Sequence, residues 1–216
     1  MNNLSVAQSF MLCGLNEKGN FPVTNNVIPA CLAAGSLIDL LLENCVSIAE
    51  KIVYVTAPLT NNLLHLQPMY QYLNEKGTIK LEKLSENYCF TFSGKKINEL
   101  TSSIGHSIVA QNSAVFKQGG ILGNKEQFIP DRNAVDGVVQ LIRAELLEDG
   151  NLSDEIVALT SLLEKSGILK RYFSSFEKDA LKARLKEIRK APSYAIIQEM
   201  LDYLDAMLIA VIVAAT

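Results

Sequence analysis

A nearly all-apolar run over residues 27–43 constrains the fold of this chain more than any other feature of its sequence. The run is longer than an ordinary β-strand, so it favours a helix. Its large aliphatic residues are Ile28, Leu32, Leu37, Ile38, Leu40, Leu41 and Leu42. These positions lie around most of a helix's circumference, and such a helix needs burial on most sides. We therefore expect a central helix that other helices surround.

Apolar residues at helical spacing predict amphipathic helices along most of the remaining chain. We expect them at residues 4–15, 63–73, 79–84, from 97 to an end at Gly119-Gly120, 135–149, 153–163, 181–188 and from 196 onward. Residues 46–55 and 121–129 predict two small β-hairpins, the second turning at Gly123-Asn124, and residues 88–92 predict a strand. The expected fold class is therefore mainly α. It is a single helical domain over residues 1–216, with a central apolar helix surrounded by amphipathic helices and two small β-hairpins.

Composition indicates one domain in a reducing compartment. No segment is rich in Pro, Gly or Ser, so the sequence shows no linker. The four cysteines lie in apolar settings without CxxC spacing, which favours reduced core residues over a disulfide frame or a zinc site. The N-terminus lacks the pattern of a signal peptide. The apolar stretch 206–215 is shorter than the roughly 20 residues that span a bilayer. We therefore expect a cytoplasmic protein.

Basic residues are concentrated in residues 165–190. This stretch holds nine of the twenty Lys and Arg residues but only three acidic ones, against a net charge of −3 for the whole chain. It has two interpretations: a solvated helix face that needs no partner, or a patch that attracts anionic lipid by roughly 1 kcal/mol per cation near the surface. No aromatic residue interleaves with the cations along residues 178–190, and the chain is not basic overall, so nucleic acid is not an expected partner.

Catalytic patterns are absent from the sequence. There is no HExxH, GxSxG, Walker loop or GxGxxG, and the glycines of residues 118–123 fit a helix end and a turn. Asp39 and Glu43 could form a carboxylate pair, but capping or pairing with neighbouring helices is the alternative. His106 is expected to be exposed, and His65 to be hydrogen-bonded at a helix edge. We expect neither an enzyme nor a cofactor.

Several segments, in order along the chain, carry a family resemblance. They are residues 32–48 (LAAGSLIDLLLENCVSI), 57–64, 116–122 (FKQGGIL), 157–176 (VALTSLLEKSGILKRYFSSF) and the apolar end 206–216. Together they resemble the Golgi phosphoprotein 3 family, and the chain looks like its bacterial members. The resemblance implies a helical core edged by small hairpins, a peripheral membrane protein and a pocket for phosphatidylinositol 4-phosphate.

The resemblance also indicates which positions would form that pocket. Family members use a tryptophan, an arginine on the long helix and two arginines three apart on a later helix. Matching the long helix without gaps places Thr24 at the tryptophan and Ala33 at the first arginine, and counting back from Gly120, where the later helix is expected to end, places His106 and Val109 at the later pair. Most of the headgroup-binding residues are therefore absent. In this chain the later hairpin, which carries apolar residues in the family, is expected to be short.

The sequence therefore predicts a peripheral protein on the inner face of a membrane that binds anionic lipid or a phosphoinositide. The candidate residues are His106 at the family site and Lys182, Lys186 and Arg189 in the basic patch. The alternative is an adaptor that binds another protein and no lipid.

Overall fold

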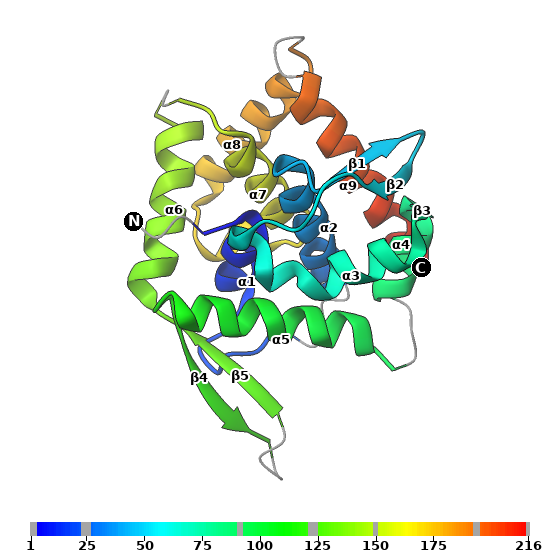
Figure 1. Ribbon diagram of the computed structural model, residues 1–216. Coiled ribbons are helices and arrows are strands. Elements are labelled where there is room, and N and C mark those ends of the chain that lie inside the picture. Colours follow the sequence, from blue (N-terminus) through cyan, green and yellow to red (C-terminus); the bar gives the residue numbers. More distant parts are fainter. Residues whose placement is uncertain are drawn as a thin grey trace.

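The computed structural model describes residues 4–22, 27–89, 93–120, 125–148, 151–191 and 195–214, and it is mainly helical, as predicted (Figure 1). The α-helices are α1 (Val6–Gly14), α2 (Val27–Leu42), α3 (Gln67–Lys76), α4 (Leu81–Cys89), α5 (Lys95–Ala110), α6 (Arg132–Leu146), α7 (Asp154–Lys165), α8 (Ser175–Ile188) and α9 (Ala195–Ala214). Two 3-10 helices are η1 (Asn61–Leu66) and η2 (Ile168–Arg171). The strands are β1 (Val46–Ala49), β2 (Ile52–Val55), β3 (Thr78–Lys80), β4 (Ala114–Gly119) and β5 (Lys125–Pro130).

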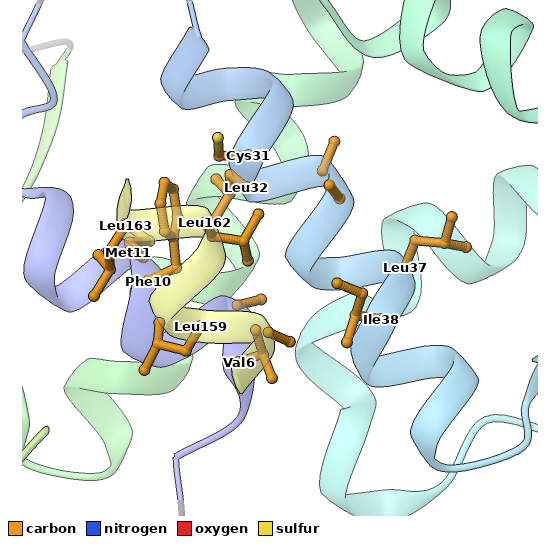
Figure 2. Packing of buried hydrophobic residues seen from close by; sticks show 14 of the residues in the cluster. Val6, Phe10, Met11, Cys31, Leu32, Leu37, Ile38, Leu159, Leu162 and Leu163 are labelled. Carbon is orange, nitrogen blue, oxygen red and sulfur yellow. The ribbon is translucent and has the colours of Figure 1, made fainter. Parts of the chain in front are cut away.

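Helix α2 is the central helix, which confirms the prediction from its apolar run. Every residue from Ala30 to Leu40 is buried, and α1, α4, α7 and α9 all pack against it. Figure 2 shows Phe10 and Met11 of α1 beside Leu162 of α7 in the layer that covers α2. Gly35 allows this close approach, because a Cβ there would lie 3.1 Å from Leu162 and 3.6 Å from the α1 backbone.

Side chains cap several helices. Ser153 caps α7, since its hydroxyl accepts from the N–H of Ile156 at 3.4 Å. Ser5 and Ser174 each form a reciprocal capping box, and Asp131 accepts from the first turn of α6. These caps satisfy backbone N–H groups that a helix leaves without internal partners.

The first predicted hairpin is confirmed and gains a third strand. β1 and β2 pair antiparallel, and β3 adds to the edge of β2 with Val53 opposite Ile79. The helix expected from residue 79 therefore begins only at Leu81, because Ile79 buries its side chain as a strand residue. The strand predicted at residues 88–92 is wrong for Tyr88 and Cys89, which end α4, and its remainder lies outside the described residues.

The second hairpin is longer than predicted, and helix α5 is shorter. α5 ends at Ala110, not at Gly119-Gly120, and Asn112 follows it with a left-handed φ of 58°. Residues 114–119, expected to be helical, form β4 and pair with β5 over six residue pairs. Contacts with the side chains of β5 stabilise this segment as a strand, although its sequence was interpreted as helical. The predicted strand at residues 121–122 and the turn at 123–124 lie outside the described residues.

The β4–β5 hairpin projects from the helical body beside α5 (Figure 1). Gly105 of α5 makes room for it, because a Cβ at that position would collide with the Phe128 ring of β5. The hairpin exposes Val115 and Phe116, whose side chains are 64% and 38% accessible. It therefore presents an apolar surface away from the helical body.

Candidate functional site

Helix α8 is fixed on the protein by its ends and by one apolar face. Leu181, Leu185 and Ile188 are buried, as predicted. At the N-terminal end Glu177 accepts from Arg143 at 2.8 Å and from the backbone N–H of Ser174 at 2.7 Å. These hydrogen bonds hold the pKa of Glu177 at about 2, with Arg143 the main cause. The opposite face of α8 is left toward solvent.

Internal partners hold several of the basic residues predicted as a patch. Arg189 donates to Asp205 at 2.9 Å, and Lys165 contacts the other oxygen of the same carboxylate. Arg184 pairs with Glu187 at 3.3 Å, and Arg171 donates to the carbonyl of Gly14 at 2.9 Å. Arg189, one of the candidate residues, therefore has a partner within the protein.

Lys182 and Lys186 are both exposed, and the ion pairs found within the described residues involve neither. Lys190 lies four residues beyond Lys186 and is also exposed, so the three lysines share one side of the helical segment. Asp179 is an exposed carboxylate on the same side. These lysines keep a positive charge directed to solvent.

The helix that carries these lysines also exposes an aromatic residue near its start. Phe176, in the first turn of α8, is 84% exposed, the largest exposure among the large apolar residues found exposed in the described chain. We call Phe176, Lys182, Lys186 and Lys190 the α8 surface. An exposed aromatic ring and exposed lysines that have no ion pair among the described residues, carried by one helical segment, suit a membrane interface.

His106 lies elsewhere, against the β4–β5 hairpin. Its Nε2 is 3.1 Å from Glu126 Oε1, and its ring centroid is 5.2 Å from those of both Phe116 and Phe128. The side chain is about half exposed, as expected. The hairpin and α8 lie at opposite ends of the view in Figure 1, so the structure does not bring His106 together with the α8 surface.

The family positions are also rearranged by the shorter α5. Ala33 is fully buried within α2, and Thr24 lies outside the described residues. The count to His106 took Gly120 as the residue that follows the helix, but the left-handed residue after α5 is Asn112, eight positions earlier. The same count from Asn112 leads to Asn98 and Thr101, which are uncharged. The observed end of α5 therefore matches the later pair to Asn98 and Thr101, and a headgroup role of His106 stays a prediction.

A buried polar cluster joins the start of α1 to α2 and η1. Asp39 of α2 accepts from the hydroxyl of Ser5 at 2.7 Å, from the N–H of Val6 at 2.8 Å and from the N–H of Ala7 at 2.9 Å. The Ser5 hydroxyl is also 3.2 Å from His65 Nε2. Asp39 therefore caps a neighbouring helix, which was one of its two interpretations, and exposed Glu43 has no place in the cluster.

Burial shifts both titratable groups of this cluster toward their neutral forms. It raises the pKa of Asp39 to about 7, although the hydrogen bonds from Ala7, Ser5 and Val6 act in the opposite direction. It lowers the pKa of His65 to about 4. Ser5 was not predicted from the sequence, although the pair Ser5 and Gln8 has the spacing of a capping box.

The described part of the chain offers neither a metal site nor a membrane-spanning helix. Across residues 4–214, apart from the undescribed gaps, no three His, Cys, Asp or Glu side chains are grouped so that they could hold a metal ion. Within the same residues no helix has the length and apolarity to cross a bilayer.

The fold defines the class of protein: a central apolar helix enclosed by amphipathic helices, with two small antiparallel sheets at the edge. The sequence model of the Golgi phosphoprotein 3 family (GPP34) matches residues 6–206, and the chain belongs to that family. The chain is also similar to the phenylalanine–tRNA ligase alpha subunit of Schizosaccharomyces pombe, with 21% identity over 208 residues and 94% of this chain. It spans only 38% of that protein's length.

Proposed function

We propose that this protein is a non-enzymatic peripheral protein that binds anionic membrane surfaces through the α8 surface, on the cytoplasmic face of the membrane. The observation that carries the proposal is the 84% exposure of Phe176 on the helix that also exposes Lys182 and Lys186. The lysines would attract anionic headgroups, and the phenyl ring would enter the interface. Membership of the Golgi phosphoprotein 3 family supports a role at membranes.

Generic anionic lipid is the favoured ligand over phosphatidylinositol 4-phosphate. A phosphoinositide headgroup calls for charge-assisted donors such as arginine forks. The recounted family positions Asn98 and Thr101 carry no charge, and Ala33 is buried. The α8 surface supplies lysines, which act as point charges and do not require one headgroup geometry.

Sedimentation with vesicles of phosphatidylcholine and increasing phosphatidylserine tests this proposal. The double variant Lys182→Glu/Lys186→Glu should weaken binding at least about 30-fold, because two cations each contribute about 1 kcal/mol. Lys117→Glu/Lys125→Glu makes the same charge change on the β4–β5 hairpin and should leave binding unchanged. Arg189 is left unchanged in these variants, because its substitution would remove a hydrogen-bonding partner of Asp205.

Three results would contradict the proposal. Binding that ignores the phosphatidylserine fraction or the salt concentration would exclude an electrostatic contact, because salt screens exposed charges. Loss in the hairpin variant alone would move the contact to the other end of the protein. Binding that requires phosphatidylinositol 4-phosphate would mean that other residues replace the missing arginines.

The β4–β5 hairpin favours a second candidate function, an adaptor that binds another protein and no lipid. Val115 is 64% exposed on a projecting hairpin, and exposed apolar side chains of this kind occur at protein contacts. Absence of sedimentation with every vesicle composition would favour this function.

A further inference from the structure

A cleft of about 600 Å³ opens between α3 and α5 and is unrelated to the α8 surface. Two rows of polar side chains face each other across it. The row on α3 is Gln67, Gln71 and Glu75, and the row on α5 is Lys95, Glu99 and Ser103. Residues four apart on a helix lie on one side of it, so each helix contributes a continuous polar edge.

The apolar positions of the same helices explain why a cleft remains between these rows. Met69 and Leu73 of α3 and Leu100 and Ile104 of α5 are buried in the core. The two helices therefore pack through these apolar stripes, while the polar rows stand beside the contact and stay in water. This arrangement leaves hydrogen-bonding groups along both walls of the cleft.

Two tyrosines also line the cleft between these walls. Tyr72 and Tyr88 pack edge to face, with ring centroids 6.0 Å apart and an interplanar angle of 74°. Tyr88 is buried, whereas Tyr72 is only partly covered. The ammonium group of Lys96 lies 4.9 Å from the Tyr72 ring centroid, as expected for a cation over an aromatic face.

The charges of the lining balance. Lys95 and Lys96 stand against Glu75 and Glu99, and the Lys95 and Glu99 side chains are 3.7 Å apart. A cleft of this kind gives no net preference for an anion or a cation. Its amides and hydroxyl both donate and accept, its carboxylates accept and its ammonium groups donate.

Hydroxyl groups of a sugar match this mixture, because each both donates and accepts. The volume lies in the range of roughly 300–1,000 Å³ that is usual for small-ligand sites. We propose that the cleft between α3 and α5 binds a neutral saccharide, with Gln71 and the ammonium group of Lys96, which lies over the Tyr72 ring, among its hydrogen-bonding partners. The saccharide can be free in solution or the headgroup of a neutral glycolipid.

Saturation-transfer NMR with a panel of neutral monosaccharides and disaccharides tests the proposal directly. At least one sugar should give a saturable signal, and Gln71→Ala and Tyr72→Leu should each reduce its affinity at least tenfold. Gln118→Ala removes an exposed glutamine from the β4–β5 hairpin and should change nothing. Gln71 is exposed, so its variant tests the cleft without disturbing the core.

Further ligands separate the sources and the competing chemistries. Free sugar that binds as well as vesicles containing the matching glycolipid supports a soluble saccharide, and stronger binding to the vesicles supports a glycolipid headgroup. Phosphocholine or glucose 6-phosphate binding without any neutral sugar would overturn the proposal. So would sugar binding that survives both cleft variants. Lys182→Glu/Lys186→Glu should not affect sugar binding. The saccharide proposal can therefore fail independently of the proposal that the α8 surface binds membranes.

Discussion

Asp39 and Asp205 each join three elements of the protein, but they do so with different partners. Asp39 accepts hydrogen bonds from uncharged donors at the start of α1 and reaches η1 through Ser5. Asp205 of α9 contacts two cations, Lys165 at the end of α7 and Arg189 at the end of α8. Asp39 is buried, whereas the Asp205 side chain is about one-third exposed.

The different partners give the two carboxyl groups opposite pKa shifts. Burial dominates at Asp39 and raises its pKa to about 7. Burial acts in the same direction at Asp205, but hydrogen bonds and charges of Lys165 and Arg189 outweigh it, and the pKa is lowered. Hydrogen bonds from uncharged donors thus hold the start of α1 on Asp39, whereas ion pairs with Asp205 join α7, α8 and α9. The second arrangement also holds the helix that carries the α8 surface.

Removal of the Asp39 carboxyl should have the largest effect. Asp39→Ala leaves the donors of Ser5, Val6 and Ala7 without their acceptor, and unsatisfied buried donors are costly. We expect the free energy of unfolding to fall by about 3–5 kcal/mol, measured by urea denaturation. A loss no larger than that of Glu43→Ala, on the exposed end of the same segment, would contradict the capping role.

Removal of the Asp205 carboxyl should have a smaller effect. Asp205→Ala leaves Lys165 and Arg189 without their carboxylate partner, but both cations are about one-third exposed and can be solvated. We expect a loss of about 1–2 kcal/mol in the free energy of unfolding. Asp179→Ala on α8, whose carboxylate has no ion pair among the described residues, is the matched control and should be nearly neutral. Equal losses at Asp39 and Asp205 would remove the distinction between the two sites.

The sequence predicted the elements that depend on local periodicity. The central helix was expected at residues 27–43 and lies at Val27–Leu42, and the hairpin at residues 46–55 is where it was expected. The burial of Leu181, Leu185 and Ile188 also follows from spacing alone. Such elements can be predicted from the sequence because the spacing of their own apolar residues decides which face is buried.

Elements decided by distant partners were predicted less well. Residues 114–119 have no strong periodicity, and their pairing with β5 makes them a strand. Asn112 was the available signal, because asparagine adopts the left-handed conformation more readily than most residues. Arg189 was likewise assigned to a patch, since its partner Asp205 lies sixteen residues away in sequence and is brought close only by the folding of α9 onto α7.

The pH dependence of stability should separate the two aspartates by sign. Because the pKa of Asp39 is raised to about 7, its contribution is full below its usual value of 3.8 and is lost as the pH rises toward 7. Because the pKa of Asp205 is lowered, its contribution is present above 3.8 and is lost as the pH falls below it. Asp39→Asn should therefore remove a decline in stability between pH 4 and 7, and Asp205→Asn a decline on the acid side.

Two other titratable groups face Asp39, and their effects on the pH dependence of stability must be distinguished from its own. Glu155 of α7 raises its pKa by repulsion, and His65, with its pKa lowered to about 4, contributes stability that is lost as the pH falls from 6.5 to 4. The slopes of Asp39 and His65 oppose each other in that range. Stability measured by urea denaturation should therefore rise with pH in Asp39→Asn and fall with pH in His65→Gln, by less than about 1.4 kcal/mol per pH unit. A flat profile in His65→Gln between pH 4 and 7 would show that the Asp39 carboxyl stays ionised, held so by its three donors.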